Sequence, residues 1–238
     1  MLVIPYIHFE SQEKAIHALL PKVDMNNKNV LEAGCGSASR FDLSRAQASG
    51  IDISPQQLEK NSVLKEKVCA DLETYENPAW QGRFDYIICW DVLEHLRHPA
   101  EVLKRFNLWL KNGGKMILAF PSPHTLKGIV TKYSPLWIHK LFYFFASRRP
   151  LFSKIEIGPF KTYFSKDIRL DHLLEYLETH QLKIEFMSSS ESYQNKFLKK
   201  FLPAGFVDGL NRLISGKIGQ MFHHSANDLI FLISRNEK

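Results

Sequence analysis

Between residues 29 and 121, short apolar runs alternate with segments of helical character, and this alternation constrains the fold more than any other feature of the chain. Each run has the length of a buried strand, and the five runs cover residues 29–32, 49–53, 67–70, 86–90 and 116–120. Helices are predicted at Ser54 to Lys65, which opens with a Ser-Pro pair, and at Pro99 to Leu110, which precedes Asn112-Gly113-Gly114. Strands that alternate with helices predict an α/β fold with a doubly wound, parallel sheet.

Polar or aromatic residues stand where these strands end. The first run ends in Glu32-Ala33-Gly34-Cys35-Gly36, whose two glycines allow a ligand close to the backbone. Asp52 ends the second strand, Asp71 follows the third, and Trp90-Asp91 follows the fourth. In sheets of this type, ligands bind at the carboxyl ends of the strands. The sequence therefore predicts a ligand site formed by these four strand ends.

Glu32 distinguishes two classes of cofactor. A dinucleotide-binding loop needs a third glycine at its sixth position and a helix N-terminus for pyrophosphate, but this chain has Ser39 there. A carboxylate two residues before the first glycine would repel phosphate. The same carboxylate favours a ligand with ammonium and sulfonium groups and no phosphate, which describes S-adenosylmethionine. In a second interpretation, which is compatible with the same site, Glu32 bonds to amides of its own loop.

Residues 29–123 resemble the class I S-adenosylmethionine-dependent methyltransferases. Four segments carry the resemblance: Val30 to Gly36, Gly50 to Ser54, Ala70-Asp71-Leu72, and Phe84 to Leu96 followed by Pro99. The last segment, with Leu110 to Gly114 behind it, is similar to the subgroup that methylates small molecules, quinones and glycans. The resemblance implies a Rossmann-like sheet of seven strands with the last strand antiparallel. It also implies S-adenosylmethionine as cofactor and S-adenosylhomocysteine as product.

Five of the matched residues would surround the methionine part of the cofactor. The resemblance implies that Gly34, Cys35 and Gly36 bring the backbone close to it. Glu32 would face its ammonium group, directly or through the loop, and the carbonyl of Trp90 would accept from the same group.

Four further residues would hold the nucleoside. By the same resemblance, Asp52 would bind the ribose hydroxyls and Ile53 would pack on the adenine. Asp71 would accept the adenine amino group, and Leu72 would supply a backbone contact. The loop departs from the family pattern, since Ala38 replaces the usual third glycine and residues 39–43 leave little room for an ordinary helix. We expect a short or irregular helix there, in place of a full one.

The two halves of the chain differ in charge. Residues 1–121 carry 14 Lys and Arg against 15 Asp and Glu, whereas residues 122–238 carry 17 against 10 and hold 12 of the 17 phenylalanines. A basic, aromatic-rich half suits an anionic acceptor, a membrane surface or nucleic acid. The alternative is a solvated basic surface over a phenylalanine-filled core.

We expect one methyltransferase domain over residues 1–238. An N-terminal helix or lid is predicted at 1–28, and the cofactor-binding half at 29–123. Helical insertions at 124–160 and 190–226 are predicted to cap the acceptor site, because their aromatic and basic residues suggest amphipathic helices. A helix at 167–180 and strands at 182–186 and 228–234 complete the prediction.

For the reaction, the resemblance implies in-line attack of an acceptor oxygen, nitrogen or carbon on the methyl group. His124 and His95 are the candidate catalytic bases, and the alternative for His95 is a contact with the cofactor's edge. On a helix, Asp91, Glu94 and His95 would share one face and, with His124, could bind a divalent metal, as in relatives that methylate vicinal diols. Asp91 could equally cap that helix.

The predicted function is methyl transfer to a small, lipid-linked or glycan-linked acceptor that carries negative charge. The alternatives are an RNA-directed methyltransferase or adaptor, and a protein that binds S-adenosylmethionine without catalysis. The three cysteines form no C-x-x-C pair, no secretion signal is visible, and the longest apolar stretch, at 136–146, is too short to span a bilayer. We therefore expect a cytoplasmic protein, with peripheral contact at the inner face of the membrane as a further prediction.

Overall fold

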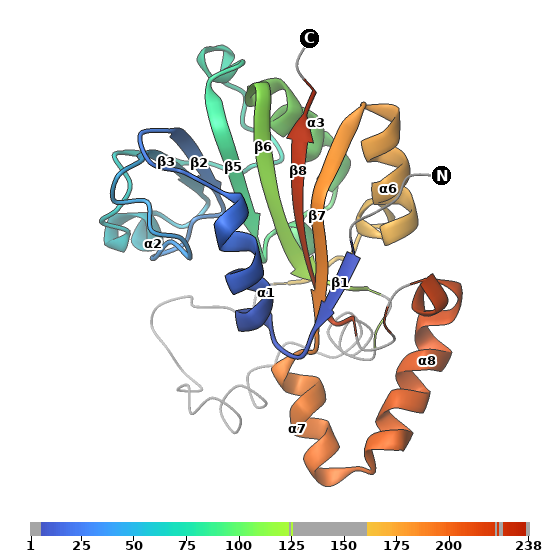
Figure 1. The fold of residues 1–238 in the computed structure, drawn as a ribbon. Coiled ribbons are helices and arrows are strands. Elements are labelled where there is room, and N and C mark those ends of the chain that lie inside the picture. Colours follow the sequence, from blue (N-terminus) through green and yellow to red (C-terminus); the bar gives the residue numbers. More distant parts are fainter. Residues whose placement is uncertain (1–5, 124, 126–160, 222, 224–225, 237–238) are drawn as a thin grey trace.

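A computed structural model describes residues 6–123, 125, 161–221, 223 and 226–236 of the chain. Its centre is an eight-stranded sheet in the order β1-β7-β8-β6-β5-β2-β3-β4 (Figure 1). The strands are β1 (Tyr6–Phe9), β2 (Asn29–Ala33), β3 (Gln47–Asp52), β4 (Glu66–Cys69), β5 (Phe84–Trp90), β6 (Leu110–Pro121), β7 (Leu182–Ser190) and β8 (Asp228–Arg235). β8 runs antiparallel to both of its neighbours, and every other pair is parallel.

This topology confirms the Rossmann-like sheet and its antiparallel last strand. All seven predicted strands are present, and β1 is an eighth that the sequence analysis did not predict. β1 has only four residues and pairs with β7 alone at the edge of the sheet. Its stability depends on contacts far along the chain, such as the 2.6 Å hydrogen bond between the hydroxyls of Tyr6 and Ser189.

Helices cover both faces of the sheet, as the alternating pattern predicts. They are α1 (Gln12–Leu19), α2 (Pro55–Lys60), α3 (Pro99–Trp109), α6 (Leu170–Thr179), α7 (Tyr193–Phe201) and α8 (Ala204–Met221). Single turns of 3-10 helix lie at η1 (Leu20–Lys22), η2 (Pro78–Trp80), η3 (Leu93–His95) and η4 (Lys166–Ile168). Figure 1 shows α1 and α3 on opposite faces of the sheet.

Two apolar clusters form the core, one on each face. On one face, α3 contributes Phe106 and Trp109, and the Trp80 ring packs edge-on against Trp109 with ring centres 5.0 Å apart. On the other face, Leu19 of α1 shares a cluster with Phe41 and Leu58. The sheet is therefore a buried middle layer, and its strand ends are held rigidly.

The segment after the first glycine loop has no room for a full helix, as expected, and the structure shows no short or irregular helix there either. Residues 34–46 form turns and bends between β2 and β3. Phe41 and Leu43 are nevertheless buried and cover the face that a helix would cover. α2 is also shorter than predicted: Ser54 caps it by accepting from the Gln57 amide, but it ends at Lys60, because Asn61 leaves the helical conformation (φ −78°, ψ 91°).

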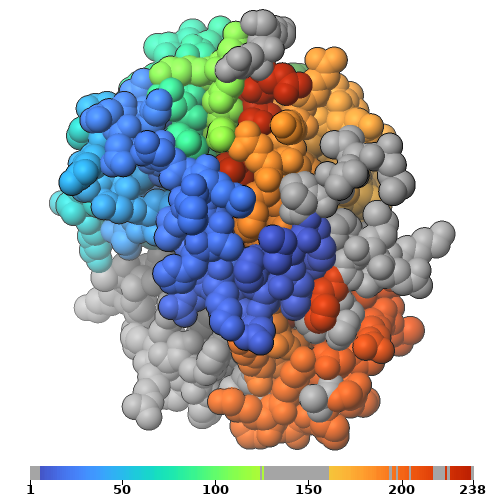
Figure 2. All heavy atoms as spheres, in the orientation of Figure 1, coloured from blue at the N-terminus to red at the C-terminus, as the bar shows by residue number. Residues whose placement is uncertain are grey.

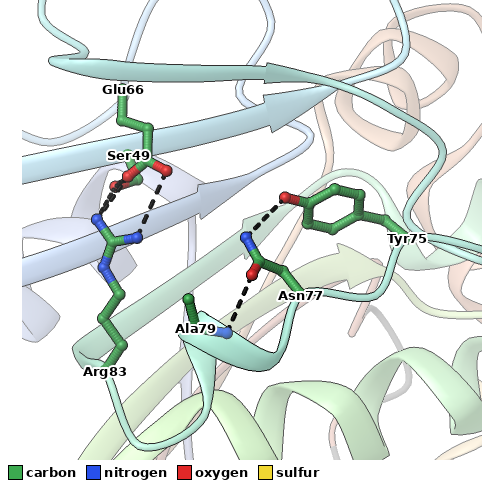
Figure 3. Close-up of polar contacts among 6 residues, drawn as sticks. All are labelled: Ser49, Glu66, Tyr75, Asn77, Ala79 and Arg83. Carbon is green, nitrogen blue, oxygen red and sulfur yellow. Dashed lines mark hydrogen bonds and ion pairs between the residues drawn. The ribbon is translucent and has the colours of Figure 1, made fainter.

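Charged residues pair at the amino ends of the strands. Arg83, just before β5, donates to Glu66 at the start of β4 with Nη2 and Oε2 2.5 Å apart, and the Ser49 hydroxyl donates to the same carboxylate at 2.8 Å (Figure 3). Beside this cluster, Asn77 donates to the hydroxyl of Tyr75 at 3.0 Å and accepts from the Ala79 amide at 3.0 Å. These bonds close the amino edge of the sheet with groups from the chain itself.

The predicted second insertion is a helical hairpin of α7 and α8, which extends from the carboxyl edge of the sheet (Figure 1). α8 is kinked at Gly216, where φ is 51°. The first predicted insertion, at 124–160, lies outside the described residues apart from Thr125, and its structure and the cap role of both insertions stay predictions. In the part of the chain that the structure describes, no helix is both long and apolar enough to cross a membrane.

Candidate active site at the carboxyl edge of the sheet

The structure brings the predicted strand ends together. β2 lies between β5 and β3, with Ala33 in register with Cys89 on one side and Ile51 on the other. Asp52 is in register with Cys69 of β4. The chain order reverses between β2 and β5, and ligands bind at such a switch point in open α/β sheets.

The loop after β2 requires glycine at Gly34. Its φ is +70°, and a Cβ atom at this position would lie 2.2 Å from the Cγ2 atom of Val92. The Gly34 amide donates to the carbonyl of Ile51 at 2.8 Å, which ties the loop to β3. Any side chain at Gly34 would therefore force the loop away from the strand ends.

Asp52 holds the same loop from the neighbouring strand. Its side chain is buried, with Oδ2 accepting from the Gly36 amide at 2.8 Å and Oδ1 from the Ser54 amide at 2.8 Å. Each carboxylate oxygen can accept more than one hydrogen bond, so both can still receive a hydroxyl. Ile53, directly after Asp52, is 67% exposed.

Glu32 is a buried carboxyl group at the end of β2. Burial raises its pKa, and hydrogen bonds from the Ser39 hydroxyl and the Arg40 amide offset part of that rise. This bond to Ser39 and Arg40 matches the interpretation in which Glu32 bonds to its own loop. A buried carboxyl with a raised pKa favours a nearby positive charge, since a cation would relieve the cost of its ionisation.

Arg40 joins the glycine loop to the end of β5, and the sequence analysis did not identify it. Its Nη2 lies 3.0 Å from Oδ2 of Asp91, and its guanidinium stands over the Trp90 ring, 5.3 Å from the ring centre. Phe41 packs edge-on against the same ring. The indole N–H of Trp90 is buried and has no hydrogen-bond partner among the described residues.

Asn61 is a second residue that the sequence analysis missed. It is fully buried, and its Nδ2 lies 3.4 Å from the carbonyl oxygens of both Cys35 and Gly36.

Burial, with the nearby Asp52 and Glu32 charges, raises the pKa of the Cys35 thiol to about 12. Cys35 thus has a packing position in the loop and remains protonated at neutral pH.

Asp71 and Leu72 follow β4, as predicted, and have different surroundings. Asp71 is exposed, and its Oδ1 accepts from the Glu73 amide at 2.8 Å. Leu72 is buried in the core, so only its backbone can serve a ligand.

The structure does not form the predicted helix face of Asp91, Glu94 and His95. Asp91 has φ 55° and precedes the 3-10 turn that begins at Leu93, so it lies outside any helix. No group of three His, Cys, Asp or Glu side chains suited to a metal occurs in the residues that the structure describes. His124, the other proposed member and candidate base, lies outside those residues.

His95 is partly buried beside Glu94. Its Nδ1 lies 2.9 Å from the Lys161 carbonyl, which can only accept, so Nδ1 carries the hydrogen and the neutral ring has its lone pair at Nε2. Burial lowers the pKa of His95, and the Lys161 bond offsets part of this. The neutral ring is therefore the favoured form at neutral pH.

Comparison with known proteins identifies the family. The profile of a family described as a methyltransferase domain matches residues 7–158, which is more than half of the chain. The chain belongs to this methyltransferase family. An S-adenosylmethionine-dependent methyltransferase from Mesorhizobium loti has the same fold, with a TM-score of 0.53 and 16% identity, covering 92% of this chain and 96% of that one.

Two further relatives show how far the likeness to this methyltransferase family extends. A ubiquinone biosynthesis O-methyltransferase of Xanthomonas oryzae pv. oryzae is 30% identical over an alignment of 128 positions that covers 46% of this chain and 53% of that protein. The chain thus spans about half the length of the curated relatives that it matches. The cyclase SpnF has the same fold at 15% identity. Its TM-score is 0.56, and the match covers 97% of this chain and 84% of that chain. The fold by itself therefore does not specify the reaction.

The residues at the carboxyl edge of the sheet fit S-adenosylmethionine, the cofactor that membership of the family implies. The glycine loop leaves room only for backbone beside Val92, Glu32 offers a buried carboxyl near the loop, and Ile53 exposes an apolar side chain next to Asp52. The donor and acceptor set suits a cationic amino acid joined to a nucleoside.

Proposed function

We propose that this chain transfers a methyl group from S-adenosylmethionine to an oxygen atom of a small, lipid-linked or glycan-linked acceptor. One observation carries the proposal: two buried carboxylates, Glu32 and Asp52, end adjacent strands on either side of the Gly34 loop. Family membership and the O-methyltransferase names of the curated relatives support the choice of reaction. The basic second half of the chain supports an acceptor with negative charge.

Each strand end has its own part in holding the cofactor. We assign the ammonium group to Glu32 and the carbonyl of Trp90, the ribose to Asp52, and the adenine to Ile53, Asp71 and the backbone of Leu72. S-adenosylmethionine, when bound, supplies an electrophilic methyl group on a sulfonium. The chain contributes rigid positioning, because the loop is tied to β3 through Gly34 and Gly36.

His95 is the candidate base within the described residues. Its Nδ1 bonds to the Lys161 carbonyl, so Nε2, which lies 3.8 Å from Oε1 of Glu94, is the atom that would take a proton from an acceptor hydroxyl. His124, placed by the sequence just after the fifth strand, remains a second candidate.

The test is transfer of label from methyl-labelled S-adenosylmethionine into a cell extract that is then separated into lipid, glycan, small-molecule, protein and nucleic-acid fractions. Asp52→Ala is the disabling variant, because it removes both loop bonds and the ribose acceptor. Asp24→Ala is the matched control, since Asp24 is an exposed acid whose Oδ1 accepts from the Asn26 amide at 3.1 Å, far from the site.

We expect Asp52→Ala to lower cofactor affinity at least about tenfold and to abolish labelling of the lipid, glycan or small-molecule fraction. Asp24→Ala should match the unmodified chain. Label in RNA would instead favour the RNA-directed alternative. Cofactor binding without label in any fraction would favour a non-catalytic binding protein, and full binding by Asp52→Ala would overturn the assigned site.

A further inference from the structure

The α7–α8 hairpin buries several polar side chains between its helices and exposes several large apolar side chains. Between the two helices, the Asn211 amide donates to Asn195 Oδ1 at 3.1 Å, and Lys199 Nζ lies 2.7 Å from both Glu191 and Asp208. A helical pair in water normally buries its apolar stripe and exposes its polar face. The described part of this hairpin departs from that arrangement, because Asn195 and Asn211 are buried beside Val207 while Phe206 and Leu213 are exposed.

The outward face carries four large apolar side chains. They are Phe201 at 72% exposed, Leu202 at 41%, Phe206 at 61% and Leu213 at 79%. Phe201 and Leu202 lie at the end of α7. Phe206 and Leu213 are seven residues apart on one face of α8. We call these four residues the outer apolar face. Figure 2 shows the hairpin at the surface of the lower end of the molecule.

Positive charge surrounds this face. Residues 193–221 contain five Lys and Arg and one acid, Asp208. Lys199 is paired with acids inside the hairpin, whereas Lys200 and Arg212 are exposed, each next to a member of the outer apolar face. Aromatic and aliphatic side chains beside exposed cations match the surface of an anionic bilayer, with its negative headgroups above an apolar layer.

We propose that the α7–α8 hairpin docks the protein on an anionic lipid surface, with the outer apolar face entering the headgroup region. The hairpin extends from the carboxyl edge of the sheet, the same edge that holds the candidate active site. Docking there places that edge toward the lipid. The docking itself requires neither the cofactor nor methyl transfer, so its test is independent of the proposed function.

The experiment is sedimentation of the full chain with vesicles of phosphatidylcholine alone and of phosphatidylcholine mixed with phosphatidylglycerol. The test variant carries Phe201→Ser, Phe206→Ser and Leu213→Ser. The matched control carries Leu20→Ser, Val63→Ser and Leu108→Ser, three partly exposed apolar residues outside the hairpin. A second pair of variants tests the role of charge. It compares Lys200→Glu in the hairpin with Lys104→Glu on α3, and both lysines are exposed.

The unmodified chain should sediment with the anionic vesicles at low salt, and added salt should weaken that binding. We expect the hairpin triple variant to lose binding at least about tenfold and the control triple variant to keep it. Lys200→Glu should weaken binding while Lys104→Glu does not, and Phe206→Trp should retain it because tryptophan suits the interface.

Three results would overturn the proposal. They are equal binding by the hairpin and control triple variants, no binding of the unmodified chain at low salt, and a concentration-dependent dimer that the hairpin variant abolishes while vesicle binding is absent. The last result would assign the outer apolar face to a second copy of the chain. Circular dichroism of each variant shows that a loss of binding is not a loss of fold.

Discussion

Two glutamates, one at each edge of the sheet, have pKa values that are shifted in opposite directions. At the amino edge, burial would raise the pKa of Glu66, but hydrogen bonds from Arg83 and Ser49 outweigh it, and the pKa is lowered (Figure 3). At the carboxyl edge, burial dominates and the pKa of Glu32 is raised. A guanidinium bonds directly to the first carboxylate, whereas a hydroxyl and a backbone amide bond to the second, which the Arg40 guanidinium affects only through its charge.

This difference is the basis on which we propose that Glu66 has a structural role and Glu32 a ligand-binding role. A carboxylate paired within the chain stabilises the fold and offers little to a ligand. A buried carboxyl whose ionisation is costly can be relieved by a cationic ligand, and such strained sites are common where proteins bind substrates. Three substitutions test whether the two edges divide in this way.

The largest effect is expected from glycine replacement at the carboxyl edge. Gly34→Ala should destabilise the fold by about 3 kcal/mol, because left-handed backbone strain adds to the overlap with Val92. Gly82→Ala at the amino edge is the matched control, since Gly82 also has positive φ (+59°) but has open space around its Cβ position. It should cost only about 1 kcal/mol.

Thermal and urea unfolding give the stability of both glycine variants. Titration with S-adenosylmethionine gives their affinity for the cofactor. Gly34→Ala should abolish cofactor binding, and Gly82→Ala should leave it unchanged. Adding Val92→Ala to Gly34→Ala should recover part of the stability, because it removes the overlapping methyl groups. Equal costs for the two glycines would show that Val92 does not constrain the loop.

A smaller effect is expected from Glu32→Gln, which should raise the stability of the fold and lower the affinity for the cofactor. Because the folded chain holds this proton more tightly than the unfolded chain, Glu32 contributes stability below its usual pKa and loses that contribution as pH rises through the raised pKa. At pH 7, Glu32→Gln should therefore stabilise the fold by about 1 kcal/mol while lowering cofactor affinity about tenfold.

Unfolding curves at several pH values provide the check for Glu32→Gln. The stability gain over the unmodified chain should shrink toward pH 4, where the Glu32 carboxyl group is protonated in the unfolded chain as well as in the folded one. A variant that is less stable at pH 7 and binds the cofactor normally would assign Glu32 a purely structural role.

The smallest effect is expected at Glu66. Its pKa is lowered, so its contribution is present above the usual glutamate pKa and is lost as pH falls through the lowered value. Glu66→Gln should cost only about 0.5–1 kcal/mol at pH 7, because both partners are 37% exposed and water screens the pair. Cofactor affinity, measured by titration, should not change; a loss of affinity would erase the distinction between the two edges.

Local patterns in the sequence were sufficient for much of this architecture. Apolar runs and helix-start signals predicted seven strands and the two-sided covering of the sheet, because buried strands and capped helices leave periodic and compositional traces. The short spacing between Ala38 and the second strand also predicted that no full helix fits there, although the short or irregular helix expected in its place is absent. The convergence of Glu32, Asp52 and Trp90 followed from parallel strand direction alone.

Other features depend on partners that are distant along the chain. β1 forms because β7, more than 170 residues away, offers its edge, and its own four residues carry too short a pattern to reveal it. Arg40 meets Asp91 and Trp90, and Asn61 meets the glycine loop, only after the strands are side by side. The predicted helix face at residues 91–95 was wrong because the chain turns at Asp91 with a positive φ.

The sequence by itself determined the class of sheet, the glycine loop and the acids at the strand ends, since these are encoded within a few neighbouring residues. The tertiary structure decided which acid is paired and which is costly to ionise, and which side of the α7–α8 hairpin faces outward. Burial and charge pairing depend on what lies across a strand or helix interface, and no local pattern records that neighbour.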